Sequence, residues 1–200
     1  MSRSIIPIET EFKFPFGNQV GKVNAFLVQD GNEAVLVDTL VEGKELEIEK
    51  ALDKAGLQWD ALKHIIITHA HPDHTGSLAA ILQHAPNAHV YASDAVSAEV
   101  PVAKVHDGET VFGLRVIETP GHTHGSISLY DDALSIMLLG DAATNIGGSL
   151  SGSPRMFTAD AGQATESLRK ITALSFDRAF FGHGSSLEGH ASEKLKQLVS

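Results

Sequence analysis

Thr68-His69-Ala70-His71-Pro72-Asp73-His74-Thr75-Gly76 is the stretch that decides the fold of this chain. Three imidazoles and a carboxylate stand within six residues, directly after the apolar run Ile65-Ile66-Ile67. A short run of β-branched residues favours a buried strand. Because proline disrupts a helix interior, Pro72 argues against placing the three histidines on one helix face. We therefore expect a strand that ends in a tight loop and aims several metal-type ligands at a common point.

Three further polar residues share the position of this loop, since each stands just past an expected strand and beside a glycine: His122, Asp141 and His183. Glycine permits the sharp turns and close backbone approach that a site built from several strand ends requires. Taken singly, each has an ordinary reading as a loop or core residue. Together with the first loop they make seven candidate ligands: His69, His71, Asp73, His74, His122, Asp141 and His183.

These ligand types limit which metals fit. Imidazole suits zinc, iron or nickel, and carboxylate adds a harder oxygen donor. The chain has no cysteine, so nitrogen and oxygen must supply every ligand. Seven such candidates at strand ends indicate a polynuclear metal site.

Composition bounds the class of protein. With 200 residues, 42% of them hydrophobic and 20% charged, the chain is expected to form one globular domain over residues 1–200. A formal net charge of −10 argues against nucleic acid or an anionic membrane as a partner. The N-terminus lacks the apolar region of a signal peptide, and no apolar run is long enough to span a membrane. We expect a cytoplasmic protein.

The periodicity of apolar residues predicts two successive blocks of strands and helices without a linker between them. A glycine- and serine-rich stretch over 145–154 is expected to be a mobile loop, and Ser93-Asp94 is expected to cap a short helix. Strands are expected at 23–29, 34–37, 65–68, 88–92, 111–112, 114–118, 126–130, 135–139 and 178–181. Helices are expected at 43–55, from 75, after Asp160, which is expected to be the N-cap, and at 191–199.

The order of these motifs resembles the metallo-β-lactamase-fold hydrolase superfamily over nearly the whole chain. The likeness rests on Asp38 after a strand, on the His-x-His-x-Asp-His motif, and on His122, Asp141 and His183 in the expected order. It implies an α/β fold, namely a four-layer αββα sandwich in which two mixed sheets are flanked by helices. It also implies the ligand assignment: His69, His71 and His122 for one metal, Asp73, His74 and His183 for the second, and Asp141 bridging both. Asp38 is expected to orient the ligand loop.

The resemblance further implies a metal-dependent hydrolase with two divalent ions, zinc first and iron or manganese as alternatives. Two such ions share a water and lower its pKa towards about 7, which makes hydroxide available to cleave the substrate. Asp73 is expected to act as the catalytic proton acceptor in addition to its role as a ligand.

Residues 119–130 are similar to the corresponding region of glyoxalase II-like thioesterases and acyl-homoserine lactonases, which implies a small ester, thioester or lactone as substrate. Seventeen residues follow His183, so the helical domain with which glyoxalase II enzymes bind glutathione is not expected. Candidates for contact with substrate or site are Phe14, Phe16, His124, Asn145, Arg155 and Met156.

Two other classes of function remain open at this point. Persulfide dioxygenases share the implied fold and use a single iron. A structural metal-binding protein is the third option, but structural sites are closed and usually four-coordinate, whereas this chain offers a surplus of ligands.

Overall fold

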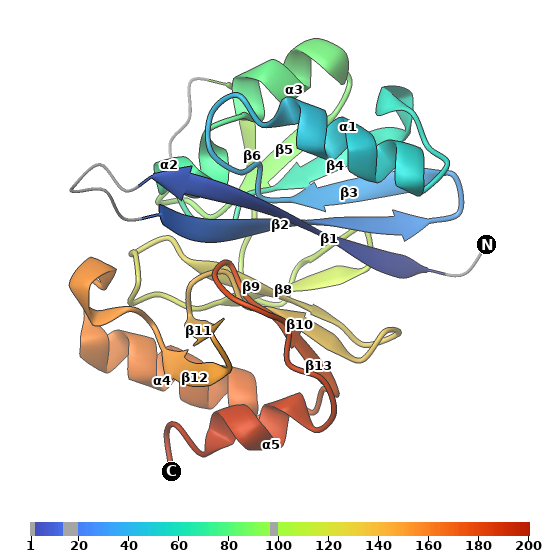
Figure 1. Ribbon diagram of the computed structural model, residues 1–200. Coiled ribbons are helices and arrows are strands. Elements are labelled where there is room, and N and C mark those ends of the chain that lie inside the picture. The colour runs from blue at the N-terminus through green and yellow to red at the C-terminus, as the bar shows by residue number, and fades with distance from the viewer. Residues whose placement is uncertain (1–2, 14–19, 97–99) are drawn as a thin grey trace. The chain divides into compact units, whose positions relative to one another are not determined.

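The computed structural model describes residues 3–13, 20–96 and 100–200. Two compact units make up the chain, and each is described by itself: residues 1–92 with 97–103, and residues 93–96 with 104–200. Each unit combines a β-sheet with helices (Figure 1). The single domain expected over residues 1–200 stays a prediction, and the candidates Phe14 and Phe16 lie outside the described residues.

The first unit is built on a mixed sheet of six strands in the order β1-β2-β3-β4-β5-β6. The first three are antiparallel neighbours, whereas β3, β4 and β5 pair in parallel. The central strands are buried on both faces, as the unbroken buried run Val23–Gln29 of β2 shows. The strands are β1 (Ser4–Lys13), β2 (Val20–Asp30), β3 (Glu33–Val37), β4 (Leu62–Ile66), β5 (His89–Ala92) and β6 (Val102–Lys104).

Helices α1 (Glu45–Lys54) and α3 (Leu78–His84) lie on one face of this sheet (Figure 1). Each turns an apolar stripe inward: α1 buries Ile48 and Leu52, and α3 buries Ile81. Two short helices flank β4 along the chain, one directly before it and one after it. They are η1 (Trp59–Ala61) and α2 (Pro72–Thr75).

The second unit has its own mixed sheet, in the order β13-β10-β9-β8-β7, and a separate hairpin of β11 and β12. All neighbours in the five-stranded sheet are antiparallel except β10 and β13, which run parallel. The strands are β7 (Thr110–Val111), β8 (Leu114–Glu118), β9 (Ile127–Asp131), β10 (Ile136–Leu138), β11 (Ala143–Ile146), β12 (Ser149–Gly152) and β13 (Arg178–Phe180). Both main sheets are therefore mixed and carry helices, which confirms the predicted fold class.

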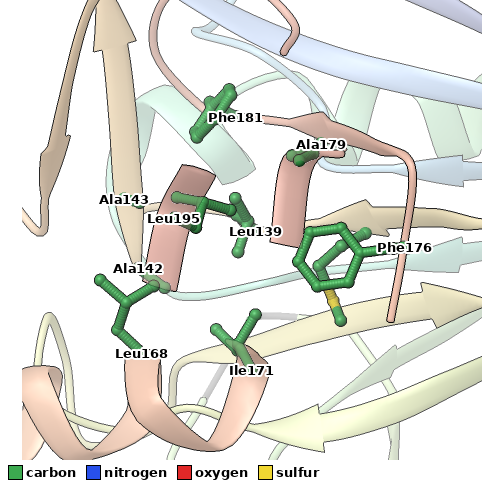
Figure 2. Close-up of a cluster of buried hydrophobic side chains, with 11 residues drawn as sticks. Leu139, Ala142, Ala143, Leu168, Ile171, Phe176, Ala179, Phe181 and Leu195 are labelled. Atoms are coloured by element: carbon green, nitrogen blue, oxygen red, sulfur yellow. The ribbon is translucent and has the colours of Figure 1, made fainter. Parts of the chain in front are cut away.

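Helices α4 (Ala161–Thr172) and α5 (Ala191–Lys196) pack with the second sheet around one apolar cluster (Figure 2). Leu168 and Ile171 of α4 meet Phe176 and Leu195, all at most 2% exposed. The predicted cap of α4 is confirmed, because the Asp160 carboxylate accepts a hydrogen bond of 2.9 Å from the backbone N–H of Gln163. The packing anchors the C-terminal half of α4, and the cap at Asp160 stabilises its N-terminal end.

The predicted strand 65–68 is shifted towards the N-terminus, since β4 ends at Ile66. Ile67 still donates its N–H to Tyr91 O, but the N–H of Thr68 donates to the Asp38 carboxylate at 2.8 Å. The backbone pairing of this strand therefore ends at Thr68, where the Asp38 side chain, just after β3, accepts the hydrogen bond in place of a neighbouring strand.

The predicted mobile loop over 145–154 is wrong. Ala143–Ile146 pairs antiparallel with Ser149–Gly152 to form the β11–β12 hairpin. Its two-residue turn is Gly147-Gly148, and both glycines have positive φ, 60° and 82°. Two consecutive residues in this region make a turn whose twist matches the flanking strands, so the glycine-rich composition marks a tight hairpin.

Two further expectations changed. Ser93 does not cap a helix within the described residues 93–96, because its hydroxyl donates to Gly125 O at 2.7 Å and the backbone forms a turn. The terminal helix is shorter than predicted and ends at Lys196. Among the described residues, no helix has both the length and the apolar character needed to cross a membrane.

Candidate metal centre

The histidine motif combines an extended segment with a short helix. His69 and His71 precede α2, while Asp73 and His74 lie within it. Pro72 occupies the first turn of α2, where its missing N–H costs nothing and its fixed φ suits a helix start. The expected tight loop is thus partly helical, although the three histidines do not share one helix face, as predicted.

Asp38 organises this segment from the end of β3. Its carboxylate is 1% exposed and accepts three hydrogen bonds: from the N–H and the hydroxyl of Thr68, both at 2.8 Å, and from His74 Nδ1 at 2.7 Å. A carboxylate only accepts, so Nδ1 of a neutral His74 carries the proton and its Nε2 keeps a lone pair. Asp38 thereby holds His74 in the tautomer that can ligate through Nε2.

The same reasoning applies to His69. The Thr68 hydroxyl gives its only proton to Asp38, so its oxygen accepts at 3.1 Å from Nδ1 of His69. His69 is fully buried, and its Nε2 is left as the ligating nitrogen. Through Thr68, Asp38 therefore sets the tautomers of two histidines.

Potential ligand atoms converge within the motif. Nε2 of His69 and Nδ1 of His71 lie 3.2 Å apart, close to the roughly 3.3 Å that separates two ligands of a tetrahedral zinc bound at about 2.0–2.1 Å. Asp73 Oδ2 lies 3.8 Å from Nε2 of His74. All four predicted ligands of the first unit thus lie in one short segment, with pairs of their nitrogen and oxygen atoms 3.2 to 3.8 Å apart.

The second unit brings its three predicted ligands together around one carboxylate. Asp141 Oδ2 lies 3.3 Å from His122 Nε2 and 3.4 Å from His183 Nε2. His122 follows β8, Asp141 follows β10 and His183 follows β13, which are neighbouring or near-neighbouring strands of one sheet. The sheet order therefore explains how residues far apart in sequence meet.

This donor set fits a divalent metal ion. An unprotonated imidazole nitrogen and a carboxylate oxygen repel at about 3.3 Å unless a proton or a cation lies between them. Two imidazoles directed at one oxygen of a buried aspartate give the mixture of nitrogen and oxygen donors that zinc or iron takes.

The loop that carries His183 is clamped by β11. Asn145 is 6% exposed, and its amide donates to Ser185 O at 3.0 Å and to Ser186 O at 3.4 Å. Gly184 has φ of 98°, and a Cβ on it would lie 2.1 Å from the carbonyl oxygen of Asn145. Glycine is thus required next to His183, and Asn145 supports the loop. A substrate contact of Asn145 stays a prediction.

The remaining described candidates are exposed. His124 is exposed, as are Arg155 and Met156, the last with an exposed fraction of 88%. Their proposed contacts with substrate stay predictions.

Sequence reasoning missed two hydroxyl residues that contact candidate ligands. Thr68 stands directly before the motif and had been assigned only to the strand. Ser153 lies 3.2 Å from His122 Nδ1, although the two are 31 residues apart. The position of Thr68 directly before the histidine motif could have indicated its role. No sequence pattern indicates the contact of Ser153 with His122.

The chain matches the model of the metallo-beta-lactamase superfamily over residues 18–105 and 95–183. It belongs to that superfamily.

A curated relative, the uncharacterized protein YobT of Bacillus subtilis (strain 168), is 31% identical over 98% of this chain and 97% of its own length. The hydroxyacylglutathione hydrolase of Aeromonas salmonicida (strain A449) is 31% identical over 78% of this chain, which spans 58% of that enzyme's length. Among solved structures, TTHA1623 in a di-iron-bound form is 26% identical, with a TM-score of 0.69 over 88% of this chain and 94% of its own.

Proposed function

We propose that this protein is a metal-dependent hydrolase that cleaves a small ester, thioester or lactone. The proposal keeps the ligand assignment that the sequence resemblance implies: His69, His71 and His122 for one ion, Asp73, His74 and His183 for the other, with Asp141 shared. Zinc is the first choice of metal, and iron or manganese are alternatives.

One observation carries the proposal: Asp141 Oδ2 faces the Nε2 atoms of His122 and His183 at 3.3 and 3.4 Å. A single oxygen shared by two imidazoles is what a bridging carboxylate needs. The buried Asp38 supports the same reading, because it prepares His69 and His74 to offer unprotonated nitrogens. A structural metal site is usually four-coordinate, so seven candidate ligands are more than such a site uses.

When bound, two such ions supply a water of lowered pKa and an electrophile that polarises the substrate carbonyl. The chain's own residues do the rest. Asp73 is partly exposed, at 19% of its side chain, whereas His74 beside it is buried. In our proposal the Asp73 carboxylate accepts a proton from the attacking water and returns it to the leaving oxygen or sulfur.

The substrate class is proposed from the likeness to a hydroxyacylglutathione hydrolase, of which this chain spans 58%. That enzyme's name describes hydrolysis of an acyl-glutathione. For this chain we propose an ester, thioester or lactone as substrate, and glutathione is not part of the proposal. A small-molecule substrate and a cytoplasmic location remain part of the proposal, and neither nucleic acid nor a membrane is an expected partner.

The test is metal analysis of the purified protein, combined with turnover on matched thioester, lactone and phosphodiester substrates. Two metal ions per chain and turnover of the thioester or lactone are expected. A matched pair of variants isolates Asp73: Asp73→Asn is expected to retain both metals and lose most of its turnover, whereas Asp60→Asn, an exposed aspartate, keeps both properties.

Three outcomes contradict the proposal. A single iron per chain with oxygen consumption on a persulfide favours the dioxygenase alternative. Full metal content with turnover confined to the phosphodiester changes the substrate class. Unchanged turnover of fully loaded Asp73→Asn removes the proton-transfer role.

A further inference from the structure

The segment from Ser153 to Asp160 holds His122 by both its backbone and its ring. The backbone N–H groups of Ala159 and Asp160 donate to the carbonyls of His122 and Gly121 at 3.1 and 2.9 Å. The hydroxyl of Ser153 lies 3.2 Å from His122 Nδ1. We call Ser153, Thr158, Ala159 and Asp160 the His122 clamp.

The hydroxyl protons of the clamp form a chain with one direction. Thr158 Oγ1 donates its only proton to the carbonyl of Pro154 at 2.7 Å. Its oxygen therefore accepts the proton of Ser153, at 2.8 Å. Since Ser153 has given its proton away, its oxygen accepts from Nδ1 of His122. A neutral His122 then carries its proton on Nδ1 and its lone pair on Nε2.

We propose that Ser153 and Thr158 are positioning residues that hold His122 in the tautomer able to bind metal through Nε2. The inference rests on the proposed function, in which His122 is a ligand. Thr158 acts through Ser153, because the Thr158 hydroxyl determines which way the Ser153 hydroxyl points. Asp141 Oδ2, 3.3 Å from Nε2 of His122, attracts the ring proton when no cation is bound, and the chain of hydroxyls opposes it by favouring the proton on Nδ1.

The two residues are expected to differ in effect. A cavity of about 500 Å³ borders both Ser153 and Thr158, and water there can replace the Ser153 oxygen as an acceptor in Ser153→Ala. In Thr158→Val the Ser153 proton loses its acceptor on Thr158 and can turn towards Nδ1 of His122, which shifts the ring proton towards Nε2. Thr158→Val is therefore expected to be the more damaging change, and Thr158→Ser to restore the chain of hydroxyls.

The first measurement needs neither metal nor substrate. Long-range ¹H–¹⁵N NMR spectra of the metal-free protein, labelled on histidine and kept above pH 8, report which ring nitrogen carries the proton. The His122 signals are identified by their loss in His122→Gln. In the metal-free protein Asp141 competes for the ring proton of His122, so the comparison between variants carries the test: we expect a higher fraction of the Nδ1–H form in the unmodified protein and in Thr158→Ser than in Thr158→Val.

The second measurement is the affinity for zinc, obtained by competition with a coloured chelator. Loss of an outer partner of a ligating histidine weakens metal binding roughly 10- to 100-fold, so we expect a loss of about tenfold or more in Thr158→Val and a smaller one in Ser153→Ala. The matched control is Ser151→Ala, which removes a similar hydroxyl pair with Thr144 at 2.9 Å on the neighbouring hairpin. Its tautomer and its zinc affinity are expected to be unchanged. Circular dichroism verifies that each variant is folded.

Two results overturn the inference: a fraction of the Nδ1–H form of His122 that is no higher in the unmodified protein than in folded Thr158→Val, or an unchanged zinc affinity in folded Thr158→Val. Failure of the proposed function looks different. A protein that has the expected tautomer and zinc affinities, but hydrolyses none of the substrates, contradicts the hydrolase and leaves the clamp intact.

Discussion

Replacement of Asp38 by asparagine tests the idea that one carboxylate sets the state of the histidine motif. Asp38 has φ of 61°, a left-handed conformation that asparagine also tolerates. The change therefore removes charge and one acceptor oxygen without adding backbone strain. Its effect comes from the three donors that meet the carboxylate: Thr68 N–H, Thr68 Oγ–H and His74 Nδ1–H.

Asparagine cannot serve all three donors in either orientation. If its NH₂ group replaces Oδ1, the buried N–H of Thr68 faces another donor. If it replaces Oδ2, His74 must move its proton to Nε2 to accept at Nδ1. One buried donor without an acceptor costs about 1–3 kcal/mol, so we expect a loss of roughly 2 kcal/mol in the free energy of unfolding. For a chain of this size that corresponds to a melting temperature lower by about 4–8 °C.

Metal binding reports the second consequence. A His74 that carries its proton on Nε2 must give it up before it ligates, so we expect affinity for the more weakly bound zinc to fall roughly 10- to 100-fold. The assays are thermal unfolding of the metal-free protein, zinc titration and the NMR tautomer measurement on His74. Asp60→Asn, the same change at an exposed position, is the control. A variant with the melting temperature, tautomer and zinc affinity of the parent refutes the reasoning.

Three more predictions concern stability. Gly184→Ala is expected to lower the free energy of unfolding by roughly 2–5 kcal/mol, because φ is 98° and the new Cβ would clash with the Asn145 carbonyl. Asp160→Ala removes the cap of α4 and is expected to cost about 1 kcal/mol in urea unfolding. Burial, with a smaller contribution from His89, lowers the pKa of His64. The unfolded chain then binds more protons than the folded one below about pH 6.5, so the stability from this residue is present above pH 6.5 and is lost as the pH falls through the folded pKa; His64→Gln should flatten this part of the stability profile.

Each stability prediction has its own control. Gly189→Ala has a similar left-handed φ, 70°, but nothing within 4 Å of the new Cβ, so a loss as large as that of Gly184→Ala would remove the clash as the cause. Asp160→Ser should retain most of the cap. For His64, parallel stability curves of parent and variant between pH 5 and 7 would contradict the sign derived above.

Much of the candidate site was predictable because its ligands stand at strand ends. Strands that run in the same direction end at the same edge of a sheet, and β8, β10 and β13 do so in the second unit. His122, Asp141 and His183, which were expected to meet, are brought together there. The buried strands and the cap at Asp160 were visible for the same reason, since burial and capping are written in local patterns.

The failures have physical causes too. Glycine permits both a loose loop and a tight turn, and composition does not distinguish them, so Gly147-Gly148 was taken for a loop. Pro72 was read as a helix breaker although it is favoured at a helix start. The role of Ser153 depends on a hydroxyl rotamer and a contact across 31 residues, and no local pattern encodes either.

The β11–β12 hairpin supports two candidate ligands at once, so a fault in its strand pairing would affect both. β11 carries Asn145, which grips the His183 loop, and β12 leads directly into Ser153, which contacts His122. A slip of one residue in the pairing of these two short strands would shift Asn145 and Ser153 relative to each other and turn side chains to the opposite face. Two histidines from distant strands would then lose their supports in one event. Misregistered molecules are expected to appear as a separate, fully folded but metal-poor population, and lengthening the glycine turn should enlarge that fraction.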